Sequence, residues 1–203
     1  MDPIILASGS PRRQEYFKMM GLPFSILPAV INESLPWITD PVRLTTELAI
    51  KKVEKVIDVM KDRPPKWILG ADTVIALDAK TINSISDKIF GKANTREEAA
   101  AMLRELSGRQ HKVVTSIALY AGSTKKIDSK SVTCLVTFAQ LKDAEINWYL
   151  DTDEWQGVAG AYRIQGLASC LITRIKGSPS TVAGLPLREF YVMLKNNGYP
   201  YGA

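Results

Sequence analysis

Short apolar runs and amphipathic stretches alternate at the start of the chain. Ile4–Ala7 is a short apolar run followed by serine, glycine and proline residues, which predicts a strand and then a turn. A helix is predicted from Pro11 to about Met20, with Ser10 as its N-cap and Gly21 just past its end. Phe24–Leu27 predicts a second strand.

The next stretch predicts a long helix followed by a buried strand. Apolar residues recur at helical spacing from about Pro41 to Lys61, and Pro64-Pro65 would end this amphipathic helix. Trp67–Leu77 is mostly apolar and rich in β-branched residues, which is typical of a strand that is buried. Asp72 lies in the middle of that strand, so we expect one polar group to point inward.

The second half of the chain mixes both kinds of pattern. Thr95 to Glu98 has the spacing of a capping box, and Gly108 follows Leu106, so a helix is predicted between them. The other predicted elements are a loop with a short hairpin (Asp78–Asn94), two paired strands (His111–Tyr120 and Lys130–Ala139), a short helix (Asp143–Leu150), a strand (Leu167–Ile175) and a last helix (Pro186–Asn196). This mixture predicts an α/β fold with a twisted sheet flanked by helices.

Length and composition indicate one core in a reducing compartment. The 203 residues are 46% hydrophobic, so residues 1–203 are expected to form a single domain of two lobes. The sequence has no run of about 18 apolar residues and no secretory signal, which predicts a cytoplasmic protein with no membrane segment. Cys134 and Cys170 lie in apolar stretches and are expected to be buried thiols.

The net charge gives a weak indication of the partner. The chain carries 26 Lys and Arg against 21 Asp and Glu, a formal charge of +5, which is compatible with an acidic ligand or simply with a solvated surface. No run of five or six like charges and no basic stripe interleaved with aromatic residues is present. A long nucleic-acid footprint is therefore not expected.

The segment SGSPRR carries the strongest local signal. A strand, a glycine-containing turn and a helix N-terminus direct backbone N–H groups and the positive end of the helix dipole to one point. Arg12 and Arg13 add two guanidinium groups there, and Ser10 adds a hydroxyl. This arrangement favours a bound phosphate, and the alternative is a surface arginine pair after an ordinary cap.

Asp72 is the candidate for chemistry because an ionised carboxylate inside an apolar strand needs compensation. A divalent metal, a positioned water or a lysine would provide it, and the alternative is an aspartate that caps a neighbouring loop. Lys52 and Lys92 are candidates to complete a phosphate site, although most lysines are solvated surface residues. Glu33 is an ordinary loop acid unless a metal brings it to Asp72.

A third loop, Ala159–Gly166, combines small residues with an aromatic ring, a guanidinium and an amide. Gln165 could contact the edge of a base there, and the alternative is a glycine-flanked turn. We expect this loop to meet the loops at 9–13 and 87–95 over one edge of the sheet. With His111 as the single histidine and no clustered cysteines, neither a zinc site nor a Ser-His-Asp triad is supported.

Taken together, seven segments, in order along nearly the whole chain, resemble the Maf family of nucleoside-triphosphate pyrophosphatases, formerly described as septum-formation inhibitors. They are LASGSPRRQEYF (Leu6–Phe17), LAIKK (Leu48–Lys52), LGADTVI (Leu69–Ile75), GK (Gly91–Lys92), MLRELSGRQHKVVT (Met102–Thr115), GAYRIQG (Gly160–Gly166) and VAGLPL (Val182–Leu187). The chain departs from the family at Ala93, where proline is usual, at Asn32, where an acid is common, and at Arg163, where glycine is frequent.

The resemblance implies a homodimeric protein with a cleft between two lobes, which cleaves nucleoside triphosphates to the monophosphate and pyrophosphate with Mg²⁺, Mn²⁺ or Co²⁺. It implies that Asp72 is the general base or organises the metal, with Glu33 beside the metal. The implied phosphate-binding set is Ser10, Arg12, Arg13, Lys52 and Lys92, and the implied base-selecting set is Arg12, Thr73 and Gln165.

The glutamine in GAYRIQG resembles the branch that acts on dTTP and UTP, which implies a house-cleaning role that extends to modified pyrimidine nucleotides. Two rival functions stay open at this point. One is a nucleic-acid-binding module, favoured by the basic charge, and the other is a regulatory protein linked to cell division that binds nucleotides without hydrolysis. The resemblance itself predicts a nucleotide substrate and no stable nucleic-acid or membrane partner.

Overall fold

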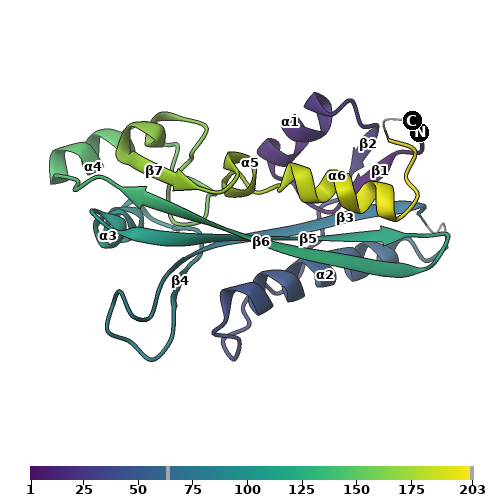
Figure 1. Ribbon diagram of the computed structural model, residues 1–203, viewed down its shortest axis with the longest axis horizontal. Helices are drawn as coiled ribbons and strands as arrows, with labels where there is room; N and C mark the ends of the chain where they lie inside the picture. The colour runs from purple at the N-terminus through teal and green to yellow at the C-terminus, as the bar shows by residue number, and fades with distance from the viewer. Residues whose placement is uncertain (63–64, 202–203) are drawn as a thin grey trace.

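The computed structural model describes residues 1–62 and 65–201, in which helices pack on both faces of one mixed sheet (Figure 1). The predicted α/β fold is confirmed. In chain order the elements are β1 (Ile4–Leu6), α1 (Pro11–Met19), β2 (Phe24–Ile26), α2 (Pro41–Val59), β3 (Trp67–Leu77), β4 (Lys88–Phe90), α3 (Arg96–Leu106), β5 (Gln110–Ala121), β6 (Lys126–Phe138), α4 (Asp143–Leu150), the 3₁₀ helix η1 (Leu167–Leu171), β7 (Ile172–Lys176), α5 (Pro179–Val182) and α6 (Leu187–Asn196).

The sheet joins a short parallel part to a long antiparallel part. The strand order is β2-β1-β3-β5-β6-β7, with β4 paired to β3 outside this path. Strand β1 is parallel to both of its neighbours, whereas β3, β5, β6 and β7 form an antiparallel series. The long strands β5 and β6 cross the whole molecule and connect its two ends (Figure 1).

One edge of β3 is covered at both ends but not in the middle. Strand β1 pairs with β3 as far as Leu69, and β4 pairs with β3 from Ile75 onward. The opposite edge pairs without interruption with β5 from Trp67 to Ala76. Residues 70–74 of β3 therefore have no paired strand on one side, within the residues that the structure describes. This gap opens the middle of a buried strand to the outside.

Separate hydrophobic clusters fill the two lobes. In the lobe that contains the termini, α1 and α6 pack on one face of the sheet around Phe17 and Phe190, and α2 packs on the opposite face around Val53 (Figure 1). In the other lobe, α3 and α4 cover a cluster that includes Leu103 and Tyr149. Both lobes use β3 and β5, so they share one sheet, as expected for a single domain of two lobes.

Several boundaries differ from the sequence-based expectation. The segment Leu167–Ile175 was expected to be a strand, but Leu167–Leu171 forms a 3₁₀ helix and the strand begins only at Ile172. Ala168 and Leu171 are buried three residues apart, which is the period of a 3₁₀ turn. The prediction that Cys170 is buried is wrong, because it lies on the outward side of this turn, whereas Cys134 is buried.

Other details refine the predicted elements. Strand β6 begins at Lys126 rather than Lys130, because its pairing with β5 continues to the end of the hairpin. Thr95 accepts a hydrogen bond from the Glu98 N–H, but the Glu98 carboxylate binds the N–H of Asn94 instead of completing the capping box. Pro64, expected to end α2, lies outside the described residues. Among the described helices, none has the length and apolarity needed to cross a bilayer.

Candidate active site

The uncovered part of β3 forms the floor of a cavity of about 740 Å³. Successive side chains of a strand point to opposite faces, so Asp72 faces α2 while Thr73 faces α1. Both reach the cavity through the gap between β1 and β4. Of the predicted site residues, the following line the cavity: Ser10, Arg12, Arg13, Glu33, Lys52, Asp72, Thr73 and Lys92.

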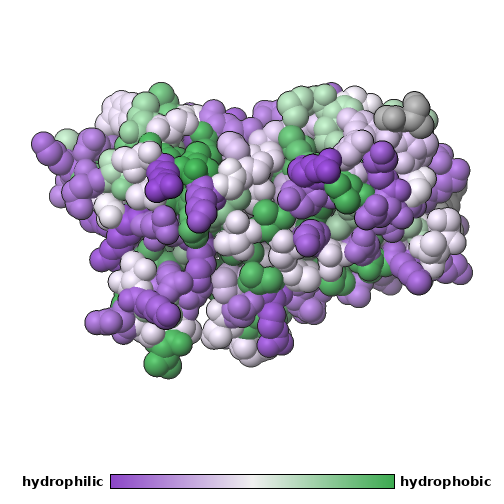
Figure 2. Space-filling model, viewed as in Figure 1, coloured by the Kyte–Doolittle hydropathy of each residue, from purple (hydrophilic) through white to green (hydrophobic). Residues whose placement is uncertain are grey.

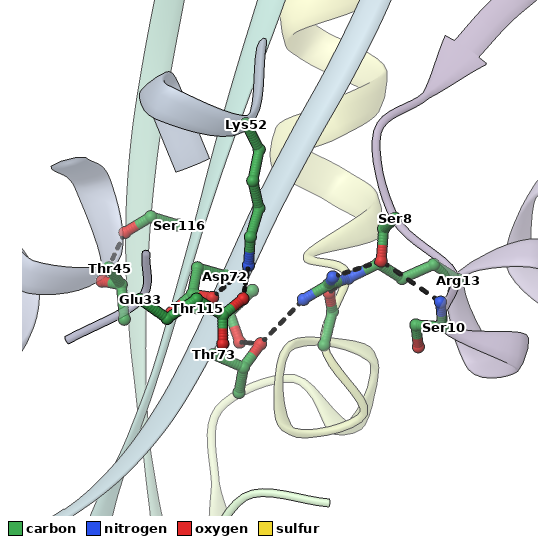
Figure 3. Close-up of polar contacts among 11 residues, drawn as sticks. Ser8, Ser10, Arg13, Glu33, Thr45, Lys52, Asp72, Thr73, Thr115 and Ser116 are labelled. Carbon is green, nitrogen blue, oxygen red and sulfur yellow. Dashed lines mark hydrogen bonds and ion pairs between the residues drawn. The ribbon is translucent and has the colours of Figure 1, made fainter. Parts of the chain in front are cut away.

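Lys52 joins the two candidate carboxylates. Its Nζ lies 2.7 Å from Asp72 Oδ1 and 2.7 Å from Glu33 Oε1 (Figure 3). The side chains of Lys52 and Asp72 are almost fully buried, whereas that of Glu33 is 49% exposed. The compensation that a buried Asp72 requires is therefore supplied by a lysine from α2, one of the three partners that the sequence allowed.

Close packing of α2 on β3 brings Lys52 to Asp72. Gly70 lies two residues before Asp72, and a Cβ at this position would overlap the carbonyl oxygen of Ala49 on α2. Because Gly70 has no side chain, the backbone of the helix can lie against the strand. The hydroxyl of Thr45, near the start of α2, also lies 2.7 Å from Ser116 Oγ on β5 and fixes the helix over the sheet.

The two carboxyl groups have opposite pKa shifts. Burial raises the pKa of Asp72 above its ordinary value, although the charges of Lys52 and Arg13 oppose this effect. Burial also acts to raise the pKa of Glu33, but its hydrogen bond with Lys52 and the charges of Lys52, Lys92 and Arg13 outweigh burial and lower it. Asp72 is therefore the better proton acceptor of the pair, and Glu33 is the more firmly ionised.

Arg13 is buried and held from three sides. Its Nε donates to the Gly184 carbonyl oxygen at 2.9 Å, Nη1 donates to Ser8 Oγ at 2.8 Å and Nη2 donates to Thr73 Oγ1 at 3.4 Å (Figure 3). Burial lowers the pKa of Arg13 to about 10, so the group stays charged at neutral pH. No acid of the described residues forms an ion pair with it, which leaves its charge directed at the cavity.

Ser8 and Gly184 also belong to the site, although the sequence did not predict a role for either. Gly184 adopts a φ of +103°, a conformation that favours glycine. Its carbonyl group orients Arg13, and Ser8 accepts from both Arg13 and the Ser10 N–H. Ser8 lies in Leu6–Phe17 and Gly184 lies in Val182–Leu187, two of the segments that resemble the family. The resemblance therefore pointed to both segments, but not to what these two residues do.

The start of α1 remains available to a ligand. Ser10 occupies the N-cap position, as predicted, but its side chain makes no capping hydrogen bond and lies in the cavity lining. The first turn of α1 contains no acidic residue that would neutralise the positive end of the helix dipole. Arg12, in that turn, is partly buried and also lines the cavity.

The three predicted loops do meet at this edge. Lys92 forms an isolated antiparallel bridge with Ala159, and the Gly160 N–H donates to the Gly91 carbonyl oxygen at 2.8 Å. Gly160 has a φ of +65°, which favours glycine, and a Cβ at this position would meet the Ile75 side chain. The loop that carries Lys92 is thereby attached to the loop at 159–166 across the cavity.

Gln165 does not line the cavity. Its side chain is exposed, and its Nε2 lies 3.4 Å from Tyr16 Oη on α1. Its neighbours Tyr162 and Arg163 line the cavity instead. Thr73 does line the cavity, and its Oγ1 lies 2.9 Å from Thr115 Oγ1. The base-selecting role of Gln165 stays a prediction, and base contact would require the side chain to leave Tyr16.

The residues fit a divalent cation only in combination with another ligand. In the described part of the chain, no group of three or more His, Cys, Asp or Glu side chains is arranged to hold a metal. Asp72 and Glu33 nevertheless converge on one point, where the Lys52 ammonium provides the positive charge. Mg²⁺ is commonly bound by one or two carboxylates together with phosphate oxygens. This donor set therefore suits a metal that enters with a phosphorylated substrate.

Comparison with known proteins agrees with the resemblance. The chain is 38% identical to a dTTP/UTP pyrophosphatase of Pelotomaculum thermopropionicum over 98% of both chains. It is 39% identical to a dTTP/UTP pyrophosphatase of Treponema denticola, again over 98% of each chain, and 38% identical to one of Symbiobacterium thermophilum over 98% of this chain and 96% of that protein. Residues 3–197 match the family described as Maf-like protein, so the chain belongs to the Maf family.

Proposed function

We propose that the protein hydrolyses nucleoside triphosphates to nucleoside monophosphates and pyrophosphate. The observation that carries this proposal is the buried Asp72 carboxylate, which opens to a cavity lined by Lys52, Arg13 and Lys92 at the N-terminus of α1. Such a site has positive charge for a polyphosphate and one proton acceptor for water. The names of the relatives support dTTP and UTP as substrates, and modified pyrimidine triphosphates belong to the same proposal.

Each residue has a distinct role in this proposal. The N-terminus of α1, the Ser10 hydroxyl, Arg13 and Lys92 bind the phosphates. Asp72 orients a water molecule and accepts its proton, because burial has raised the pKa of this carboxyl group. Lys52 holds Asp72 in place, and its charge favours the ionised form of the carboxyl group.

Asp72 and Glu33 are the proposed ligands of a divalent cation such as Mg²⁺, Mn²⁺ or Co²⁺. When bound, the cation would neutralise charge on the phosphates and polarise the bond to be broken. Glu33 suits this role because its lowered pKa keeps it ionised. The proposal also includes base selection by Thr73 and Gln165, a phosphate contact from Arg12, which belongs to both implied sets, and assembly as a homodimer.

The test is release of pyrophosphate from a panel of normal and modified triphosphates with Mg²⁺ or Mn²⁺. Asp72→Asn keeps the shape of the side chain but removes the proton acceptor, so kcat should fall by about 100-fold or more. Asp58→Asn, at an exposed position of α2, is the matched control and should retain wild-type turnover. No release from any triphosphate, combined with salt-dependent binding of oligonucleotides, would favour the nucleic-acid-binding alternative instead.

A further inference from the structure

The cavity contains a second pair of cationic side chains, Arg12 and Arg163. Arg12 comes from the first turn of α1, and Arg163 comes from the loop at 159–166. Neither side chain forms an ion pair with a carboxylate of residues 1–62 or 65–201. Two guanidinium groups that line one cavity without an ion-pair partner favour an anion from outside the chain.

Arg163 is fixed at its backbone and unsatisfied at its side chain. Its backbone N–H donates to Tyr149 Oη at 2.9 Å, which fixes where the side chain leaves the loop. The Nε atom of Arg163 is buried and has no hydrogen-bond partner among the described residues. A buried donor without an acceptor costs free energy, which a change of side-chain conformation toward a ligand oxygen would recover.

The acids closest along the chain do not satisfy Arg163. Asp153 and Glu154 also line the cavity. The Glu154 carboxylate accepts the Leu167 N–H at 2.8 Å, and the Asp153 carboxylate accepts from Gln156 at 3.0 Å. Both acids are therefore engaged in holding their own loop, and neither lies within ion-pair distance of Arg163.

Arg163 is the charged residue that acts most strongly on Arg12. After burial, the charge of Arg163 is the largest cause that lowers the pKa of Arg12. The charges that act most strongly on Asp72 and Glu33 come instead from Lys52, with Arg13 and, for Glu33, Lys92. Arg12 also lowers the pKa of Arg13, so the two groups of charges adjoin in one cavity and suit neighbouring parts of an extended anion.

We propose that Arg163, together with Arg12, binds the two terminal phosphates of the triphosphate, the part that leaves as pyrophosphate. The three cations Lys52, Arg13 and Lys92 face the carboxylates of Asp72 and Glu33, which leaves one net positive charge, or three when the proposed divalent cation is bound. A triphosphate brings roughly four negative charges. A neutral pyrimidine ring cannot relieve the repulsion between two guanidinium groups, whereas phosphate oxygens match their paired donors. This assignment rests on the proposed function.

Calorimetric titration without turnover tests the assignment. The probes are pyrophosphate, UMP and the non-hydrolysable α,β-methylene analogue of UTP, each with Mg²⁺ in the buffer. Arg163→Gln should weaken binding of pyrophosphate and of the analogue about tenfold or more, because a charge-assisted contact is lost, and should change the affinity for UMP less than about threefold. Arg163→Lys keeps the positive charge but loses the paired N–H donors of the guanidinium. Its affinity for pyrophosphate and for the analogue should lie between those of the wild type and Arg163→Gln. Arg109→Gln, at an exposed position outside the cavity, is the matched control.

Two results would overturn the assignment. An equal loss of affinity for UMP and for the analogue would place Arg163 at the nucleoside or the first phosphate, and unchanged affinity for all three probes in a folded variant would leave Arg163 with a structural role alone. Thermal unfolding of each variant verifies folding. If the wild-type protein binds the analogue but releases no pyrophosphate from UTP, the proposed hydrolysis is wrong. The titrations still show whether Arg163 binds the terminal phosphates.

Discussion

At the scale of single residues, His111 shows how burial sets the charge state of a group outside the site. Its Nε2 lies 2.9 Å from Tyr162 Oη, and its ring packs edge-on against Phe138 with the ring centroids 5.2 Å apart. The second ring nitrogen, Nδ1, is buried with no partner among the described residues. Burial lowers the pKa of His111 to about 4, so the folded protein holds the ring neutral.

This shift predicts a pH dependence of stability. Below pH 6.5 the unfolded chain protonates His111, whereas the folded protein does so only near pH 4, so folding loses stability as the pH falls between these values. The loss from this group reaches about 3 kcal/mol. His111→Gln should remove that part of the slope, as measured by urea unfolding at pH 7 and at pH 4.5. Identical slopes for the variant and the wild type would contradict the shift.

The sequence predicted most of the residues that line the cavity, but not their contacts. A carboxylate inside an apolar strand requires a compensating partner, so the local pattern was enough to predict that Asp72 has one. Which partner compensates it depends on how closely α2 approaches β3, a property of tertiary packing that no local pattern contains. Gln165 lies away from the cavity for the same reason, because the course of its loop is set by contacts with Tyr16 and Tyr149.

At the scale of elements, the contact between α2 and β3 at Gly70 is the step that builds the site. Gly70→Ala would place a methyl group against the Ala49 carbonyl oxygen and Val53 and push the helix from the strand. Overpacking of this kind costs about 1–3 kcal/mol. Because Lys52 would move with the helix, kcat/KM for UTP should also fall, by about tenfold or more. Thermal unfolding and pyrophosphate release measure the two effects.

Gly91→Ala is the matched control for stability, since no atom lies within 4 Å of a Cβ at that position. Its melting temperature should equal that of the wild type within error. A Gly70→Ala variant with the wild-type melting temperature and full turnover would contradict this prediction. It would mean that the close approach of α2 to β3 at Gly70 is not what positions Lys52.

Some elements were predictable from local composition. Helix α4 and strand β3 have the predicted bounds, and β3 is a continuous, mostly apolar run that polar residues flank at both ends. The segment Leu167–Ile175 is short and mixes apolar residues with Ser169, Thr173 and Arg174, and its pattern does not separate a strand from a helical turn. The sheet order decided the outcome there, since only Ile172–Lys176 reaches β6.

At the scale of the whole molecule, the shared strands should make the two lobes one unfolding unit. Strands β3 and β5 supply residues to the cores of both lobes, for example Leu69 and Leu119 in one and Leu77 and Val113 in the other. Opening either core would therefore break the ladder on which the other depends. This architecture leaves the cavity between the lobes as a gap in a continuous sheet rather than as a joint between two domains.

Leu103→Ala tests this cooperativity. Leu103 is fully buried on α3, in the lobe away from the termini, and its truncation should cost about 2–5 kcal/mol. If the chain unfolds as one unit, the slowest-exchanging amides of β1, in the other lobe, should lose the same free energy of protection as those of α3. Arg104→Ala, at an exposed position on the same helix, should change both by less than about 0.5 kcal/mol. If β1 instead keeps its wild-type protection in Leu103→Ala, the two lobes open independently. The β3–β5 ladder would then separate at the cavity, and the loss of stability around α3 would not reach β1.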